Sequence, residues 1–335
     1  MIPYGTGDLS QTLMLRRIGG GLRQEIARVS AEIASGQRSD PARALGGNLM
    51  QLATIEHGLV QADRYASSAK FGATLLASQQ NSVEQIGIIT ERLAPDLRMS
   101  AQPTSPDALG AAAARARAGF EDAIGLLNTK VAGRYIFAGI DGDQRPFAGA
   151  QDMLDSITAG LPANATPADV TAHVTAWFAD GGPFEALAYQ GGPAPSNSID
   201  LGDGNSFRLD TTGASPGIRD TLAAMALGAM AETLSAQMPL ADRRALLAAG
   251  SEAMTASTDG RIAAQANIGA QEARAAKALA QAEAKSASYK ILRTELRAAD
   301  PYENAMALES AAQKLDALYL VTARLSRLSL TEYLR

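Results

Sequence analysis

Cysteine is absent from this sequence, tryptophan occurs once, and aromatic residues make up only 5% of it. The absence of cysteine excludes disulfide bonds, thiolate metal sites and cysteine nucleophiles, and it is compatible with a reducing or an oxidising compartment. Hydrophobic residues nevertheless account for 46% of the chain, and many of them are alanine. This composition favours long helices packed closely through small side chains over pockets with aromatic walls.

Strong charge and long apolar runs are also missing. The net charge is −5, and no block of like charges forms a binding tail, which argues against nucleic acid as a partner. No apolar run approaches the roughly 18 residues of a membrane span, so we expect no membrane-embedded part. The first residues, MIPYGTGDLSQTL, lack the features of a cleavable signal peptide. If the protein is exported, we expect a route without such a signal.

Residues for catalysis or nucleotide binding are scarce. The two histidines, His57 and His173, lie outside any metal or triad spacing, and His57 is best interpreted as a residue of a long helix. The run Gly19–Gly21 follows no predicted strand and no Gly-Lys-Ser/Thr segment accompanies it, so neither nucleotide fingerprint is met. The segment 213–217 has the spacing Gly-x-Ser-x-Gly, but its serine is followed by Pro216, which has no N–H for an oxyanion hole, so we predict no nucleophile elbow. We therefore predict that the protein is not an enzyme.

Two acidic turns are candidate calcium sites, at 141–143 and 200–205. The first has Asp152 where a calcium loop needs a glutamate, and its spacing of acidic residues is incomplete. The second is better explained as the turn of a β-hairpin, where glycine and asparagine tolerate positive φ. We predict no metal and no cofactor.

The last 36 residues predict an apolar helix that needs a partner. Asp300 is a suitable N-cap, Pro301 suits the first helical position, and Glu303 stands where a capping box places an acid. The apolar residues that follow recur at spacings of three and four and form one stripe; they are Leu315, Leu318, Val321, Leu325 and Leu328.

The N-terminal region carries a matching stripe with coiled-coil spacing. Its members are Leu15, Ile18, Leu22, Ile26, Val29 and Ile33. Gly19–Gly21 lies inside the pattern, and each glycine costs about 1 kcal/mol against alanine in a helix interior. We expect this helix to form only when packed, and we predict that the two terminal stripes pair as an assembly seam.

The middle of the chain predicts long helices around an insert. A helix of about 40 residues should run from Leu52 to near Pro95, and another from Asp107 to Lys130. The segment 140–216 is rich in proline and glycine and contains Trp177, two short helices and a hairpin at 199–209. Helices return at Pro216 and from Leu240 to Arg297, with an irregularity near Asp259.

The predicted fold is mainly α: a long antiparallel helical bundle or coiled coil formed by both chain ends, with a small inserted α+β domain. The predicted domains are a terminal coiled coil (1–45 with 298–335), a helical bundle (46–139 with 217–297) and an outward-facing insert (140–216). The sequence alone leaves open the topology of the insert, the number of subunits in an assembly and the role of the glycine run.

Four segments together resemble the flagellin superfamily and, within it, the hook–filament junction family. They are EIASGQRSDPARA (32–44), GRYIFAGIDGDQRPF (133–147), IGAQEAR (268–274) and ARLSRLSLTEYLR (323–335). The resemblance covers the helical flanks, about two thirds of the chain. It does not extend to the insert, the opening MIPYGTGDLS or the glycine run.

The resemblance implies a structural component of the bacterial flagellum, an adaptor ring that joins hook to filament. Its terminal helices would pair as a coiled coil lining the filament core, and its partners would be other copies of itself, hook-associated proteins, flagellin subunits and an export chaperone. The resemblance further implies type III export to an extracellular location. Flagellin, the bulk filament subunit, is an alternative of the same class; a secreted helical effector or regulator is an alternative of another class.

Overall fold

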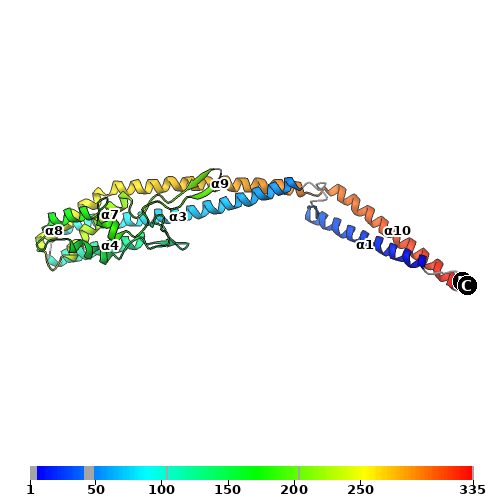
Figure 1. The fold of residues 1–335 in the computed structure, drawn as a ribbon, viewed down its shortest axis with the longest axis horizontal. Coiled ribbons are helices and arrows are strands. Elements are labelled where there is room, and N and C mark those ends of the chain that lie inside the picture. The colour runs from blue at the N-terminus through cyan, green and yellow to red at the C-terminus, as the bar shows by residue number, and fades with distance from the viewer. Residues whose placement is uncertain (1–5, 41–48, 103–104, 203, 334–335) are drawn as a thin grey trace. The chain divides into compact units, whose positions relative to one another are not determined.

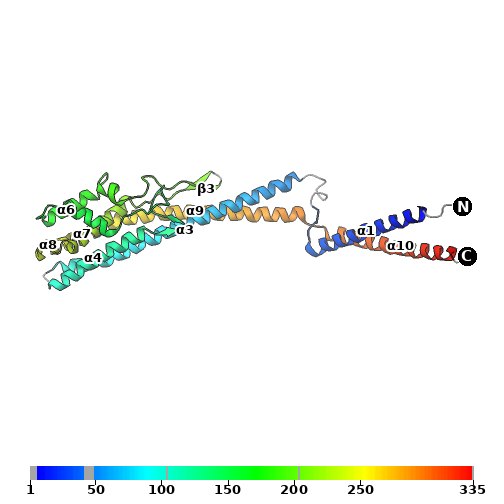
Figure 2. The ribbon, with the colours of Figure 1, turned by 60° about the horizontal axis from the view of Figure 1, so that its bottom comes forward.

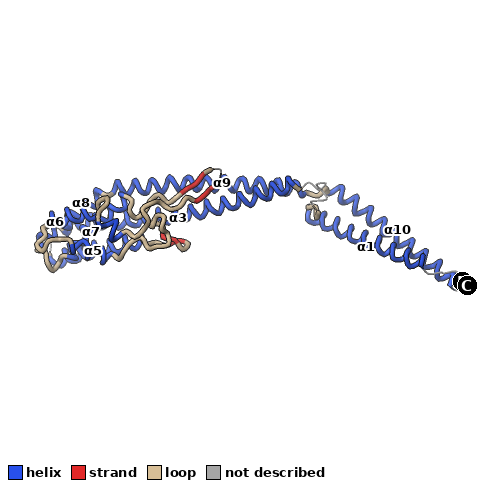
Figure 3. Tube along the Cα trace, in the orientation of Figure 1, coloured by secondary structure: helices blue, strands red, loops and turns tan. Residues whose placement is uncertain are grey.

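The computed structural model describes residues 6–40, 49–102, 105–202 and 204–333. Helix accounts for 74% of the chain, and the strands form only two small sheets (Figure 3). The predicted mainly α fold is confirmed. The chain divides into two compact units, which comprise 1–62 with 284–335 and 63–283. The three-part division with an insert at 140–216 stays a prediction.

The first unit contains the two terminal helices. Helix α1 (Thr6–Ser35) and helix α10 (Pro301–Tyr333) lie side by side in both views of the ribbon (Figures 1 and 2). Helix α1 ends where Gly36 adopts a φ of 66°, which a glycine reaches without strain. The predicted loop at 35–48 lies partly outside the described residues, because 41–48 are not described.

The start of α10 confirms the predicted cap. The Asp300 carboxylate accepts hydrogen bonds from the backbone N–H groups of Tyr302 (2.8 Å) and Glu303 (3.2 Å). Pro301 is the first residue of the helix, where its missing N–H leaves no hydrogen bond unmade. Local sequence alone therefore determines where α10 begins.

The longest helix is α3 (Met50–Ser100), and its predicted end near Pro95 is wrong. A proline in a helix interior removes one backbone hydrogen bond and costs about 3 kcal/mol. The helix continues because its last turns are held by packing: Leu93 and Leu97 are buried, and the Ser251 hydroxyl donates to the Ala94 carbonyl (2.6 Å). Tertiary contacts override the local signal here.

Four further helices complete the bundle of the second unit. They are α4 (Pro106–Leu127), α7 (Pro216–Thr233), α8 (Leu240–Ala256) and α9 (Thr258–Arg297). The break between α8 and α9 confirms the predicted irregularity near Asp259. Helices α7 and α9 approach closely at their first turns, where a Cβ on Gly217 would lie 2.0 Å from the Gly260 carbonyl oxygen. Only glycine fits at that contact.

Small elements fill the segment between α4 and α7. Strands β1 (Lys130–Val131) and β2 (Arg134–Tyr135) form one antiparallel pair. Helices α5 (Ala150–Ala159) and α6 (Pro167–Trp177) and a π-helical turn, η1 (Phe184–Ala188), follow. Strands β3 (Ile199–Gly202) and β4 (Asn205–Phe207) then form a second antiparallel pair.

The second pair confirms the predicted hairpin at 199–209, although residue 203 of its turn lies outside the described residues. The Asp200 carboxylate accepts a hydrogen bond from the Gly202 N–H (2.9 Å), which is the turn chemistry that the sequence indicates. The hairpin rests on α3, because a Cβ on Gly72 would lie 2.2 Å from the Phe207 ring.

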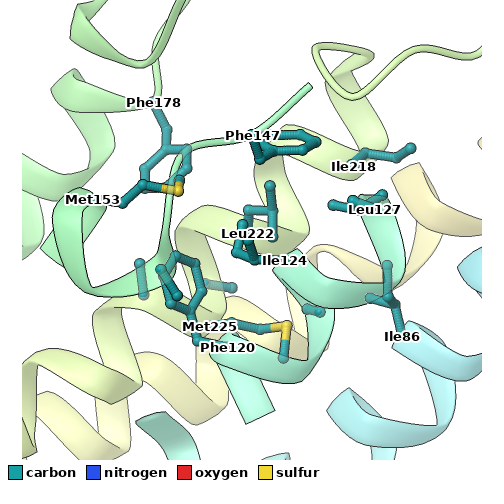
Figure 4. Packing of buried hydrophobic residues seen from close by; sticks show 14 of the residues in the cluster. Ile86, Phe120, Ile124, Leu127, Phe147, Met153, Phe178, Ile218, Leu222 and Met225 are labelled. Carbon is teal, nitrogen blue, oxygen red and sulfur yellow. The ribbon is translucent and has the colours of Figure 1, made fainter. Parts of the chain in front are cut away.

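The hydrophobic core lies in the second unit, between Ala69 and Leu279. Phe120 and Leu127 of α4 meet Leu222 and Met225 of α7 and the ring of Phe147 (Figure 4). One amide is buried at its edge: Gln79 of α3 donates hydrogen bonds to the carbonyl oxygens of Ile136 (2.6 Å) and Thr211 (2.8 Å). The core therefore joins α3 to segments far from it in sequence.

Candidate assembly interface

Helix α10 turns one regular face toward α1. Its described residues that are buried or half-buried include a set spaced alternately by four and three, the heptad pattern of a coiled-coil seam. This set is Asn304, Leu308, Ala311, Leu315, Leu318, Thr322 and Leu325. Alanine, asparagine and threonine interrupt the leucines, so the face buries less apolar area than a continuous leucine seam would.

Helix α1 presents a face with the same spacing toward α10. Leu15, Gly19, Leu22, Ile26 and Val29 are buried or half-buried, and their spacings are four, three, four and three. Contacts at both ends show that the helices are antiparallel, because Gly19 meets Leu318 while Gln37 pairs with Ala298. Each helix thus presents a heptad face to the other.

Gly19 occupies a core position of this pair. A Cβ built on Gly19 would lie 3.1 Å from Cδ2 of Leu318, whereas a Cβ on Gly20 or Gly21 would meet nothing within 4 Å. Leu318 therefore fills the space that a side chain at position 19 would take. The close packing at Gly19 accounts for one glycine of the run and leaves the other two without a packing role in the single chain.

The structure brings seven of the eleven predicted seam residues to the inner faces of α1 and α10. These residues are Leu15, Leu22, Ile26, Val29, Leu315, Leu318 and Leu325. The side chain of Leu328 lies outside the described ones.

Three predicted seam residues point to solvent in the single chain. The exposed fractions are 42% for Ile18, 45% for Ile33 and 48% for Val321. The α1–α10 contact therefore does not include them. A role for them in contacts with other subunits stays a proposal.

Four residues of the pair were missed by the sequence analysis. Gly19 was passed over for its apolar neighbour Ile18, although continuing the four-three spacing from Leu15 reaches Gly19. Arg23 and Tyr319 form a cross-helix contact: the guanidinium donates to the phenol oxygen (2.8 Å) and lies 6.0 Å from the ring centroid. Glu32 is a buried carboxylate, 3% exposed, and no apolar pattern signals it.

Two hydrogen-bond donors hold the Glu32 carboxylate in the last turn of α1. It accepts hydrogen bonds from the Arg28 guanidinium (2.8 Å) and from the Ser39 N–H (2.9 Å). Burial of the carboxylate favours its protonated form, but these hydrogen bonds outweigh burial and keep the pKa of Glu32 below its ordinary value. Arg28 also pairs with Glu25 (2.5 Å), so the cluster joins three charges on consecutive turns.

Large apolar side chains remain exposed on the outer faces of both helices. Leu13 and Met14 of α1 are 61% and 65% exposed, and Leu320 of α10 is 66% exposed. Tyr302 and Met306 are also exposed near the start of α10. Side chains of this size on both helices form an apolar surface that a further protein chain can cover.

Other candidate sites give no catalytic arrangement within the described residues. No group of three or more His, Cys, Asp or Glu side chains there is placed to hold a metal ion. His173 contacts Gly160, and its Nε2 is buried without a hydrogen-bond partner. In the described part of the chain, none of the helices is both long and apolar enough to span a membrane.

The perturbed pKa values in the second unit also have structural causes. Burial lowers the pKa of Arg261, whose guanidinium donates to Thr90 (3.0 Å) and pairs with Glu91 (3.3 Å), and this contact ties α9 to α3. Burial raises the pKa of Tyr189 to about 12, and its hydroxyl donates to the Phe137 carbonyl (3.1 Å). Both side chains join elements of the fold.

Comparison with known proteins gives a likeness in fold. No family model matches the sequence. No curated protein matches it either. Among solved structures, one described as a flagellar hook-associated protein from Vibrio parahaemolyticus superposes with a TM-score of 0.51 at 12% identity, over 77% of this chain and 98% of that one. FlgL of Bacillus cereus superposes with a TM-score of 0.50 at 16% identity, over 72% of this chain and 98% of that one.

Proposed function

We propose that this chain is a structural subunit of the bacterial flagellum that joins the hook to the filament, without catalysis. The observation that carries the proposal is the shared fold: this chain covers 98% of both a hook-associated protein and FlgL. The likeness takes in nearly the whole of each structure, so it is not confined to one common helical hairpin.

The proposed mechanism is coupled folding and assembly. Helices α1 and α10 pair within each subunit, and their exposed outer residues, such as Met14 and Leu320, are covered by neighbouring subunits. Burial of apolar surface at about 25 cal/mol per Å² then offsets the cost of ordering helices that are weak alone. Ile18, Ile33 and Val321 are proposed to belong to these contacts between subunits.

The proposed partners follow from the same role. They are other copies of the chain, hook-associated proteins and flagellin subunits, with an export chaperone before secretion. The proposed location is outside the cell, at the hook–filament junction, after type III export without a cleavable signal peptide. The net charge of −5 fits a partner set that contains no nucleic acid.

Deletion of the gene in the organism that carries it tests the role. We expect cells that retain hooks, lack filaments and do not swim, with motility restored by the wild-type gene. Hooks and filaments are counted by electron microscopy. Swimming cells with normal filaments would overturn the flagellar role and favour a secreted helical effector or regulator.

A second measurement separates the junction role from the alternative of flagellin. Purified flagellin-like subunits would extend seeds into long filaments, whereas a junction subunit would give short assemblies or none.

Complementation with Leu318→Asp tests the helix pair, because the substitution buries a charge against α1 at Gly19. Ala317→Asp is the matched control, since Ala317 is exposed on the same helix. Full motility with Leu318→Asp would contradict assembly through the α1–α10 pair.

A further inference from the structure

Backbone hydrogen bonds tie together the two segments that flank the terminal helices. The Arg38 N–H donates to the Arg297 carbonyl (2.8 Å), and the Ala299 N–H donates to the Gly36 carbonyl (3.0 Å). Between them, Gln37 and Ala298 form an antiparallel bridge. The segment 36–39 directly follows α1 and the segment 297–300 directly precedes α10. These hydrogen bonds therefore close the inner end of the helix pair.

Side chains strengthen this short ladder on both strands. Arg38 donates from Nε to the Ala298 carbonyl (3.1 Å) and pairs with Glu303 in the first turn of α10 (3.6 Å). The buried Glu32 of α1 accepts from the Ser39 N–H (2.9 Å). Arg38 thus connects the ladder to α10, and Glu32 connects it to α1.

The helix faces alone do not determine a unique register. Both carry small or polar residues at core positions, and a heptad face can slip by seven residues, roughly 10 Å along the axis, and still present a similar face. The ladder cannot slip, because a seven-residue shift would break both backbone hydrogen bonds. The backbone hydrogen bonds between 36–39 and 297–300 therefore specify the register more strongly than the helix faces do.

The outer part of the pair is the weaker part. Gly19–Gly21 lowers the helix propensity of α1 there, and the neighbouring Leu13 and Met14 are exposed. Forming a first helical turn is unfavourable, whereas adding a turn to an existing helix is not. If the helices pair first at the ladder, the first helical turn of α1 forms there and not at Gly19–Gly21.

We propose that the ladder between 36–39 and 297–300 is a register clip: it fixes the antiparallel alignment of α1 and α10, and pairing extends from it toward the chain ends. Fraying then begins beyond Gly19–Gly21, while the inner turns stay paired. The clip acts within one subunit. It does not depend on the flagellar role, and its test uses the purified full-length protein.

Cross-linking of engineered cysteines measures the register, and the cysteine-free sequence makes it specific. The double variant Arg23→Cys/Tyr319→Cys reports the observed alignment, since these side chains meet. The double variant Arg23→Cys/Ala305→Cys reports a slip of one heptad, because the contact of Gly19 with Leu318 places position 23 about nine residues, roughly 13 Å, from Ala305 in the observed alignment. With a short bismaleimide at low protein concentration, we expect the first pair to cross-link within one chain and the second to react at least about tenfold less.

Ala299→Pro removes one N–H of the ladder and leaves the faces of α1 and α10 unchanged. In this background we expect the ratio of aligned to slipped product to fall by roughly tenfold, the scale of one or two lost hydrogen bonds. Gln37→Ala is the matched control, because it keeps every backbone hydrogen bond of the ladder and should preserve the ratio. The fluorescence of the buried Trp177 verifies that the second unit of each variant is folded.

Amide hydrogen exchange tests the direction of pairing. In the wild-type chain we expect slower exchange in residues 26–35 than in 13–21, and in Ala299→Pro we expect this difference to disappear. An unchanged cross-linking ratio in Ala299→Pro would overturn the clip. Equal exchange along α1 in the wild type, or no aligned product in the wild-type background, would overturn it as well.

Discussion

Gly19, Gly20 and Gly21 are consecutive residues of α1 with different surroundings. Only Gly19 faces Leu318, while open space surrounds the Cβ positions of the other two. A glycine without a packing role still weakens a helix by about 1 kcal/mol relative to alanine. The run therefore combines one residue that fits the helix pair with two that lower the stability of α1.

Alanine substitutions separate these two effects. Gly20→Ala and Gly21→Ala should each stabilise α1 by about 1 kcal/mol. Gly19→Ala should gain less or destabilise, because the new Cβ at 3.1 Å requires Leu318 to move. Amide exchange of residues 13–25 measures the change. Equal stabilisation by all three substitutions would show that Leu318 does not pack on Gly19.

Glu32 makes the inner end of α1 sensitive to acid. Its pKa is lowered in the folded chain, so its ionised form stabilises the fold above the unfolded value of about 4.3, and this contribution is lost as the pH falls through the folded pKa. Arg28 is half-buried and partly screened by solvent, so the ionised carboxylate should contribute about 1 kcal/mol.

The comparison with Glu32→Gln isolates this carboxylate from Glu25, Arg38 and Glu303 nearby. At neutral pH, residues 26–35 should exchange several-fold faster in Glu32→Gln than in the wild type. As the pH falls through the lowered pKa of Glu32 the two rates should converge, because the wild-type carboxylate then becomes protonated. The ratio of rates at each pH cancels the intrinsic pH dependence of exchange. A ratio independent of pH would exclude Glu32 as the titrating group.

At the scale of elements, local signals in the sequence predicted helix starts and turns better than helix ends. Asp300 and Pro301 begin α10 as expected, and the hairpin at 199–209 forms as expected, because caps and turns depend on adjacent residues. Pro95 did not end α3, since Leu97 and the Ser251 hydroxyl hold the last turns from other elements. Contacts of this kind cannot be read from neighbouring residues.

The candidate interface shows the same limit. Hydrophobic spacing identified Leu22, Ile26 and Leu318, but it chose Ile18 where the helix pair uses Gly19. Apolar character marks which residues avoid water, whereas the choice between adjacent positions depends on the partner helix. The ladder at 36–39 consists of backbone hydrogen bonds and one buried acid, so no side-chain pattern predicts it.

At the scale of the whole molecule, the hydrophobic core is confined to the second unit. The buried cluster runs from Ala69 to Leu279, and Trp177 lies within it at 2% exposure. Helices α1 and α10 of the first unit are held by their contact with each other and by the short ladder. Because the cluster contains no residue of α1 or α10, the second unit has the buried apolar area to fold without them.

A chain truncated to residues 49–300 tests this independence. We expect its Trp177 fluorescence to report the same unfolding midpoint in urea as that of the full chain, because the removed helices contribute nothing to the cluster around Trp177. In the full chain, helical ellipticity should begin to fall at lower urea than Trp177 fluorescence, since α1 and α10 unfold first. Phe120→Ala provides the control within the core: it should lower the free energy of unfolding seen by Trp177 by about 3–5 kcal/mol in both chains. Loss of native Trp177 emission in the truncated chain would mean that the terminal helices are required for the core to form.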